Sequence, residues 1–293
     1  MRAGMGKVAL AALLAVGITA AQAGQPAISV VAAENFYGDM ARQIAGPDVP
    51  VTSILSNPDD DPHMFEASAS VARALAGARI VIANGADYDP WIDKLLAASP
   101  SANRQVITVA ALIHRTAGDN PHLWYDPAAM PAAAEALATA LGVADPAHAA
   151  GYAARRDVFL ASLQPIQAKV RAMREKYAGT KVTATEPVFG YMAAALGLTM
   201  RNERFQIAVM NDTEPSASDV AAFEDDLRQH KVRLLLYNSQ ASDAAAKRLL
   251  DIAQAAKIPV VGVTETEPAG STFQSWVLGE LQAVDAALSR PGS

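Results

Sequence analysis

Short runs rich in β-branched residues alternate with longer amphipathic runs along almost the whole chain, from about residue 28 to the C-terminus. β-branched runs favour strands, and apolar residues that recur every three or four positions favour helices. Where the two kinds of run alternate in this way, the strands form a parallel sheet and the helices cover its faces. We therefore predict an α/β fold with mainly parallel sheets covered by helices.

The length of the chain divides this pattern into two lobes. The chain has 293 residues, which is more than one typical domain contains. We assign residues 24–144 to an N-terminal lobe, 145–177 to a connector helix and 178–293 to a C-terminal lobe. The expected strands are 28–32, 49–55, 79–84 and 105–109, then 181–185, 198–200, 232–237 and 258–263. The expected helices are 36–45, 68–76, 90–98 and 127–141, then 190–196, 216–229, 243–256 and 272–288.

The connector carries the longest helical pattern in the chain, beginning at Asp145-Pro146 and running to about Tyr177. A helix of that length is roughly 45 Å long, which is more than one lobe needs. We expect it to cross both lobes. Pro165 lies in its middle and should kink it or split it in two.

The first 23 residues are typical of a cleavable secretory signal. Arg2 and Lys7 give a basic start, an apolar run of about thirteen residues follows, and small residues stand at the cleavage positions. That run is too short to span a bilayer, and no later apolar stretch approaches about eighteen residues. The chain contains no cysteine, so no lipid anchor or disulfide is expected. We therefore expect a periplasmic protein without direct membrane insertion.

The charge of the chain argues against nucleic-acid binding. Its formal net charge is −6, loss of the signal would make it −8, and no basic block occurs. The composition excludes long disordered segments as well.

Two of the five histidines lie in similar settings about sixty residues apart. His63 and His122 each follow a proline in a run of Asp and Asn, which favours a stiff loop over a helix or a buried strand. Two such loops can bring two imidazoles to one metal ion. The alternative is that each is a surface-loop histidine. His114, His148 and His230 lack this setting, and we interpret them as surface residues.

Two carboxylates mirror these histidines in the second lobe. Glu186 and Glu265 each follow an expected strand, and open α/β sheets bind ligands beyond the carboxyl ends of their strands. Two imidazoles and two carboxylates suit a divalent first-row metal ion. The alternative is that Glu186 caps the following helix. Asp126, four residues after His122, could hold the second imidazole nitrogen or cap the helix at Pro127.

Several longer segments resemble the cluster A metal-binding family of ABC-transporter solute-binding proteins. The resemblance covers essentially the whole chain after the signal. It is carried by Asp61-Pro62-His63-Met64-Phe65-Glu66, by Ala83-Asn84-Gly85-Ala86-Asp87-Tyr88-Asp89-Pro90-Trp91-Ile92, by Asn120-Pro121-His122-Leu123-Trp124-Tyr125-Asp126-Pro127, and by Phe189-Gly190-Tyr191 followed by Leu196-Gly197-Leu198.

The resemblance implies four metal ligands. His63 and His122 match the first two positions of the family. Glu186 stands at the third, three residues before Phe-Gly-Tyr, where many zinc binders have His and manganese binders have Glu. The fourth is usually an Asp after the last strand, and here both Glu265 and Glu267 are available. We prefer Glu265 because it is nearer the strand end.

The resemblance also implies the function. A periplasmic solute-binding protein of this kind captures one divalent transition-metal ion between its lobes and delivers it to an ABC-transporter membrane permease. We expect a monomer, and we place manganese first as cargo, zinc second and iron third. The order assumes that both glutamates bind through both oxygens, which gives the six-coordination that suits manganese or ferrous iron.

Two other functions compete with this one. A two-lobed protein could bind a small organic ligand, with the histidines as hydrogen-bond donors. A periplasmic metal-dependent hydrolase would need an open coordination position and a general base. The chain has no His-Glu-x-x-His pair, Gly-x-Ser-x-Gly turn or phosphate loop. We therefore expect a binding protein and not an enzyme.

Overall fold

The first lobe is built on a four-stranded parallel sheet. The computed structural model describes residues 28–57, 65–240 and 244–290. The strands of this sheet are β1 (Val30–Glu34), β2 (Val51–Leu55), β3 (Ile80–Ala83) and β4 (Gln105–Thr108), in the order β2-β1-β3-β4. Every pairing is parallel. The predicted parallel sheet is confirmed.

Helices cover both faces of this sheet, so its two central strands, β1 and β3, are buried throughout. Val30 and Ala32 pack into one core cluster together with Phe36 of α1. Val31 packs on the opposite face with Leu75 of α2. The helices and short helical turns of this lobe are α1 (Asn35–Ala45), α2 (Ala69–Gly77), α3 (Pro90–Ala98), α4 (Val109–Leu112), η2 (Leu123–Tyr125), α5 (Ala129–Ala144) and η3 (Pro146–His148).

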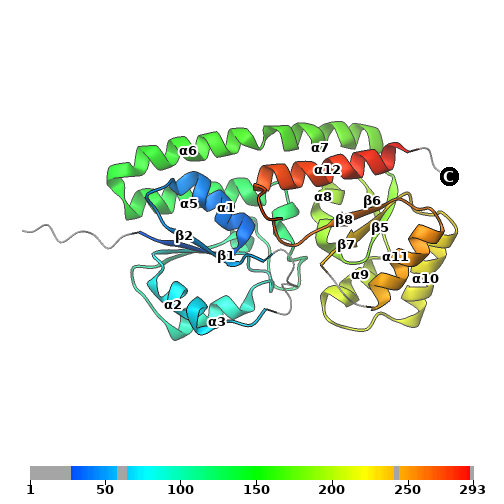
Figure 1. Ribbon diagram of the computed structural model, residues 1–293, viewed down its shortest axis with the longest axis horizontal. Helices are drawn as coiled ribbons and strands as arrows, with labels where there is room; N and C mark the ends of the chain where they lie inside the picture. The colour runs from blue at the N-terminus through cyan, green and yellow to red at the C-terminus, as the bar shows by residue number, and fades with distance from the viewer. Residues whose placement is uncertain (1–27, 58–64, 241–243, 291–293) are drawn as a thin grey trace, which may run out of the picture.

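The second lobe repeats the architecture. Its strands are β5 (Lys181–Ala184), β6 (Thr199–Arg201), β7 (Leu235–Asn238) and β8 (Val260–Val263), all parallel, in the order β6-β5-β7-β8. Its helices are η4 (Pro187–Phe189), α8 (Gly190–Ala195), α9 (Glu203–Met210), α10 (Ala217–Arg228), α11 (Ala244–Ala255) and α12 (Phe273–Ser289). In Figure 1 the two sheets lie in separate halves of the molecule.

The predicted connector is divided into two helices, α6 (Ala149–Ser162) and α7 (Gln164–Tyr177). The break falls at Leu163, and Pro165 lies in the first turn of α7, as the sequence predicts. Figure 1 shows α6 over the first lobe and α7 over the second. In both ribbon views α12 runs beside α7. Asp285 of α12 accepts hydrogen bonds from Lys169 and Tyr177 of α7, both at 2.5 Å.

Several strands begin two or three residues later than predicted. Val49, Val232 and Ile258 lie just before β2, β7 and β8 and are buried. They are apolar because they pack in the core, and not because they pair in the sheet.

The helix α9 is missing from the prediction since its eight residues are too few for a clear helical period. Within the described parts of the chain, no helix combines the length and apolarity that crossing a bilayer requires.

Candidate metal centre

Three side chains of the second lobe meet beyond the carboxyl ends of its strands. Glu186 lies two residues after β5, Asn238 is the last residue of β7, and Glu265 lies two residues after β8. Because these strands are parallel, their carboxyl ends lie at one edge of the sheet. All three side chains are buried, with exposures of 4%, 2% and 1%. Two carboxylates are therefore held close together away from water.

His122 enters the same place from the first lobe. It precedes the short turn η2 and is fully buried. The rings of Trp124 and Tyr88 pack edge-on against the imidazole, with centroids 5.3 and 6.1 Å away. These aromatic rings form an apolar wall that keeps water from one side of the imidazole.

The imidazole faces both carboxylates. Its Nε2 lies 3.5 Å from Glu265 Oε2 and 3.8 Å from Glu186 Oε1. One donor atom from each of the three residues lies within 4.8 Å of the other two. A tetrahedral ion with bonds of about 2.1 Å separates its ligand atoms by about 3.4 Å. The three side chains are thus spaced as ligands of a single ion.

Asn120 determines which nitrogen of His122 is available. Its Oδ1 lies 2.6 Å from the imidazole Nδ1 and also accepts the backbone N–H of His122. An amide oxygen can only accept, so the neutral ring carries its proton on Nδ1 and has its lone pair on Nε2. That Nε2 is buried and has no hydrogen-bond partner among the residues described. A lone pair facing two carboxylate oxygens calls for a cation between them.

The two carboxylates are held by neutral donors. Asn238 Nδ2 donates to Glu186 Oε2 and to Glu265 Oε1, both at 2.7 Å. The Tyr88 hydroxyl donates to Glu265 Oε2 at 3.1 Å. Burial, and to a lesser extent the negative charge of Glu265, raises the pKa of Tyr88 well above its usual value. The hydroxyl therefore keeps its proton and remains a donor. Gln240 Oε1 accepts from the backbone N–H groups of Glu265 and Thr266, which fixes the loop that carries Glu265.

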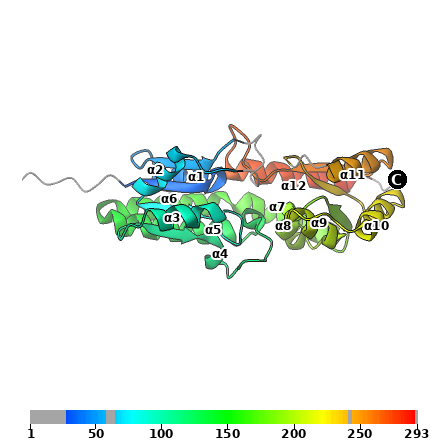
Figure 2. The ribbon, with the colours of Figure 1, turned by 90° about the horizontal axis from the view of Figure 1, so that it is seen from below.

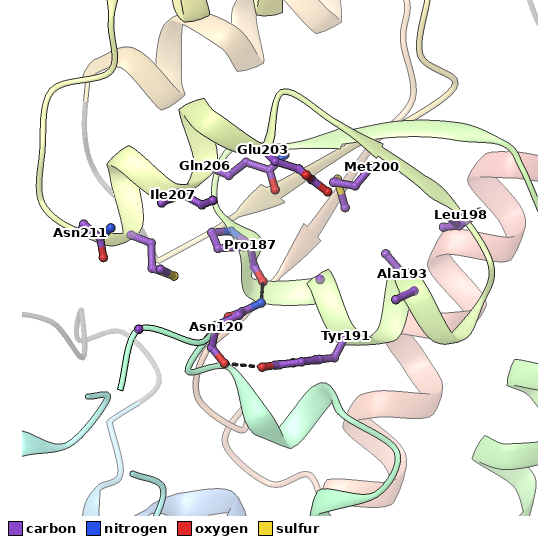
Figure 3. A pocket seen from close by; sticks show the side chains of 14 residues that line it. Asn120, Pro187, Tyr191, Ala193, Leu198, Met200, Glu203, Gln206, Ile207 and Asn211 are labelled. Atoms are coloured by element: carbon purple, nitrogen blue, oxygen red, sulfur yellow. Dashed lines mark hydrogen bonds between the residues drawn. The ribbon is translucent and has the colours of Figure 1, made fainter. Parts of the chain in front are cut away.

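Asn120 also joins the two lobes next to the site. Its Nδ2 donates to the carbonyl of Pro187 at 2.7 Å, and its own carbonyl accepts from Tyr191 at 2.7 Å. Figure 3 shows both bonds at the edge of a pocket of about 440 Å³ between the 118–120 segment and the helices α8 and α9. Pro187 directly follows Glu186, so one amide group connects His122 with the backbone beside Glu186.

The structure brings together three of the four predicted ligands, His122, Glu186 and Glu265. The fourth, His63, lies outside the described residues. Glu267, the alternative to Glu265, is not part of the cluster. Its backbone N–H and carbonyl bond to Asn35, and burial and the nearby Asp39 raise the pKa of its carboxyl to about 8.

The structure also tests the alternative interpretations of Glu186, Asp126 and the remaining histidines. Glu186 precedes η4 but its side chain does not cap it. Asp126 pairs with Arg115 at 3.3 Å and accepts from the N–H of Ala128, while Asn120 takes the second imidazole nitrogen. The three remaining histidines, His114, His148 and His230, are exposed as predicted. The supporting role of Asn120 was not predicted, and the polar residues Asn238 and Gln240 at a strand end are too common to be assigned a role from sequence. The only signal in the sequence is that Asn238 ends a strand beside those that precede the two glutamates.

Comparisons with known proteins agree with this fold. A sequence model of the family described as "Zinc-uptake complex component A periplasmic" matches residues 30–287. The iron-binding protein YfeA of Yersinia pestis is 23% identical over 228 residues, which cover 75% of this chain and 72% of that protein. The solved periplasmic zinc binding protein TroA from Treponema pallidum matches with a TM-score of 0.77 at 22% identity, over 91% of this chain and 100% of the other. The Mn-bound periplasmic metal binding protein from Candidatus Liberibacter asiaticus matches with a TM-score of 0.70 at 18% identity, over 89% and 99%. The two solved structures show that the fold is shared.

Proposed function

We propose that this chain, which belongs to the family of periplasmic zinc-uptake complex component A proteins, captures one divalent first-row ion. Members of this family are metal-binding substrate-binding proteins of ABC importers and not enzymes. The proposed ligands are His122, Glu186 and Glu265, with His63 as the fourth. The ion is cargo, bound and later released unchanged. Neither an organic ligand nor a hydrolytic reaction is favoured by the residues at the site.

One observation carries this proposal. The Nε2 atom of the fully buried His122 faces two buried carboxylates 3.5 and 3.8 Å away. Burying two carboxylates beside a lone pair is costly unless a cation neutralises them. An organic ligand would need donors aimed at all three groups at once, whereas a single metal ion satisfies all three.

The candidate cargo ions are manganese and zinc, with ferrous iron third. A set of imidazole and carboxylate ligands without any thiolate suits all three. Relatives carry names for different metals, iron for the Yersinia pestis protein and zinc for the Treponema pallidum protein. The glutamate at position 186 supports manganese, because carboxylate oxygens suit that ion better than a further imidazole does.

The remaining parts of the proposal concern location and partners. We infer export through the N-terminal signal of residues 1–23, a monomeric form in the periplasm, and delivery of the ion to a membrane permease of the ABC type. Two lobes, residues 24–144 and 178–293, enclose the ion, and the connector of residues 145–177 crosses both.

Calorimetry tests the proposal. Protein stripped of metal with a chelator is titrated with manganese, zinc and ferrous ions in separate experiments. We expect a stoichiometry near one ion per chain, since the described residues contain one cluster of this kind, and loss of that binding in His122→Ala. Flat titrations with all three ions would overturn the proposal.

A further inference from the structure

We propose that Asn238 limits each of the two glutamates to one metal-binding oxygen and thereby sets the preference of the site among first-row ions. The inference rests on the proposed metal site and adds a residue that decides specificity without being a ligand.

The amide of Asn238 is oriented by its surroundings. Its Oδ1 accepts the backbone N–H of Gln240 at 3.1 Å. The backbone N–H of Asn238 bonds separately to Thr185 Oγ1 at 3.1 Å, and that bond does not orient the amide. With the oxygen end engaged, the Nδ2 end must face the glutamates. An amide nitrogen carries two hydrogens, and here one bonds to Glu186 and the other to Glu265, both at 2.7 Å.

These bonds divide the four carboxylate oxygens into two pairs. Glu186 Oε2 and Glu265 Oε1 bond to Asn238. Glu186 Oε1 and Glu265 Oε2 lie toward His122 Nε2. Glu265 Oε2 also accepts from the Tyr88 hydroxyl, so a hydrogen bond alone does not keep an oxygen from an ion. While Asn238 keeps its bonds, however, each glutamate is held with one oxygen toward the imidazole.

The number of carboxylate oxygens that bind the ion determines its coordination number. Two imidazoles and two single oxygens give four ligands, the tetrahedral set that zinc adopts. If both carboxylates turn to bind through both oxygens, the site offers six ligands, which suits manganese or ferrous iron. That turn breaks two charge-assisted bonds in a buried site, where an unpaired N–H group is costly. Asn238 therefore opposes the six-coordinate form and leaves the four-coordinate form unaffected.

Replacement of Asn238 by alanine removes this restraint while keeping all four proposed ligands. We expect Asn238→Ala to shift the ratio of manganese to zinc affinity toward manganese by at least about tenfold, the equivalent of one of the two lost hydrogen bonds to a charged group. Thr185→Val is the matched control, because it removes a buried partner of the Asn238 backbone and leaves the amide on the glutamates. The control should keep the wild-type ratio.

The experiment is a competition titration of zinc, buffered by a chelator, against manganese for the full chain and each variant, with circular dichroism to confirm folding. X-ray absorption on the bound ions gives the coordination number, which should rise in Asn238→Ala loaded with manganese. If alanine prevents folding, Asn238→Ser serves in its place, because its single hydroxyl donor can hold only one carboxylate and should give a smaller shift in the same direction.

The outcomes separate this inference from the proposed function. An unchanged manganese-to-zinc ratio and coordination number in the folded variant would overturn the role of Asn238 while one ion per chain still bound. Absence of metal binding by the wild-type chain would overturn both.

Discussion

Replacement of Glu280 by glutamine should stabilise the protein at neutral and alkaline pH. Glu280 lies on α12 and accepts hydrogen bonds from the Tyr125 hydroxyl, the Trp276 indole and the backbone N–H of Thr264, at 2.5, 3.0 and 3.2 Å. Burial raises the pKa of its carboxyl to about 7 in spite of these bonds. The ionised form is therefore less favourable in the folded protein than in water.

The sign of the pH effect follows from proton binding. Below pH 4.5, the ordinary value for this group, the carboxyl is protonated in both the folded and the unfolded chain. As the pH rises to about 7, the unfolded chain loses the proton first, so the free energy of unfolding falls across this window. A shift from 4.5 to about 7 corresponds to at most roughly 3 kcal/mol, at 1.36 kcal/mol per pH unit.

Glutamine can keep the bonds without the charge. Its amide oxygen can accept from Trp276 and Thr264, and its NH₂ can donate to the Tyr125 hydroxyl, which in turn donates to the carbonyl of Thr264 at 2.9 Å. The gain in the free energy of unfolding should approach the same 3 kcal/mol or so above pH 7 and vanish near pH 4.5.

Urea unfolding of metal-free wild type and Glu280→Gln at a series of pH values measures this difference. Glu175→Gln, on the exposed face of α7, is the control and should follow the wild type. The free energy of unfolding is plotted against pH for each protein. If the difference between Glu280→Gln and wild type stays constant from pH 4.5 to 8, ionisation of the Glu280 carboxyl does not destabilise the folded protein, and the reasoning is refuted.

Three further changes test the site and its motion. Asn120→Ala removes the bond that orients His122 and the tie to Pro187, so the ion should dissociate about tenfold faster or more in a chelator chase; an unchanged rate would exclude a positioning role. Glu186→His should move metal preference toward zinc in competition titrations, and the same ratio before and after would show that Glu186 does not touch the metal. Small-angle scattering of metal-free and loaded protein should differ only slightly, because α7 and α12 are tied together along the second lobe and Asn120 links the lobes; a large change in the radius of gyration would contradict this.

The sequence was sufficient to predict both parallel sheets and the break in the connector next to Pro165. Strands buried on two faces leave runs of β-branched residues, and a proline inside a helical pattern removes a backbone donor. Strand starts were less predictable, because an apolar residue such as Val232 packs in the core before pairing begins. The short helix α9 depends on contacts with its neighbours, which no local pattern records.

The candidate ligands were predictable because they occupy positions that chemistry restricts. His122 follows a proline in an Asp/Asn loop, and Glu186 and Glu265 follow strand ends. The groups that hold them were not predictable. Asn120 and Asn238 are common residues, and their roles arise only when distant strands and loops meet. Tyr125 and Glu280 are 155 residues apart in the chain, so their pairing is a property of the fold alone.

The most direct measurement of the central claim is anomalous diffraction from crystals of the full chain loaded with manganese or zinc. We predict a single strong anomalous peak per chain, within bonding distance of His122 Nε2, Glu186 Oε1 and Glu265 Oε2, with His63 as a further ligand. A peak at another place, or an ion that contacts neither glutamate, would contradict it.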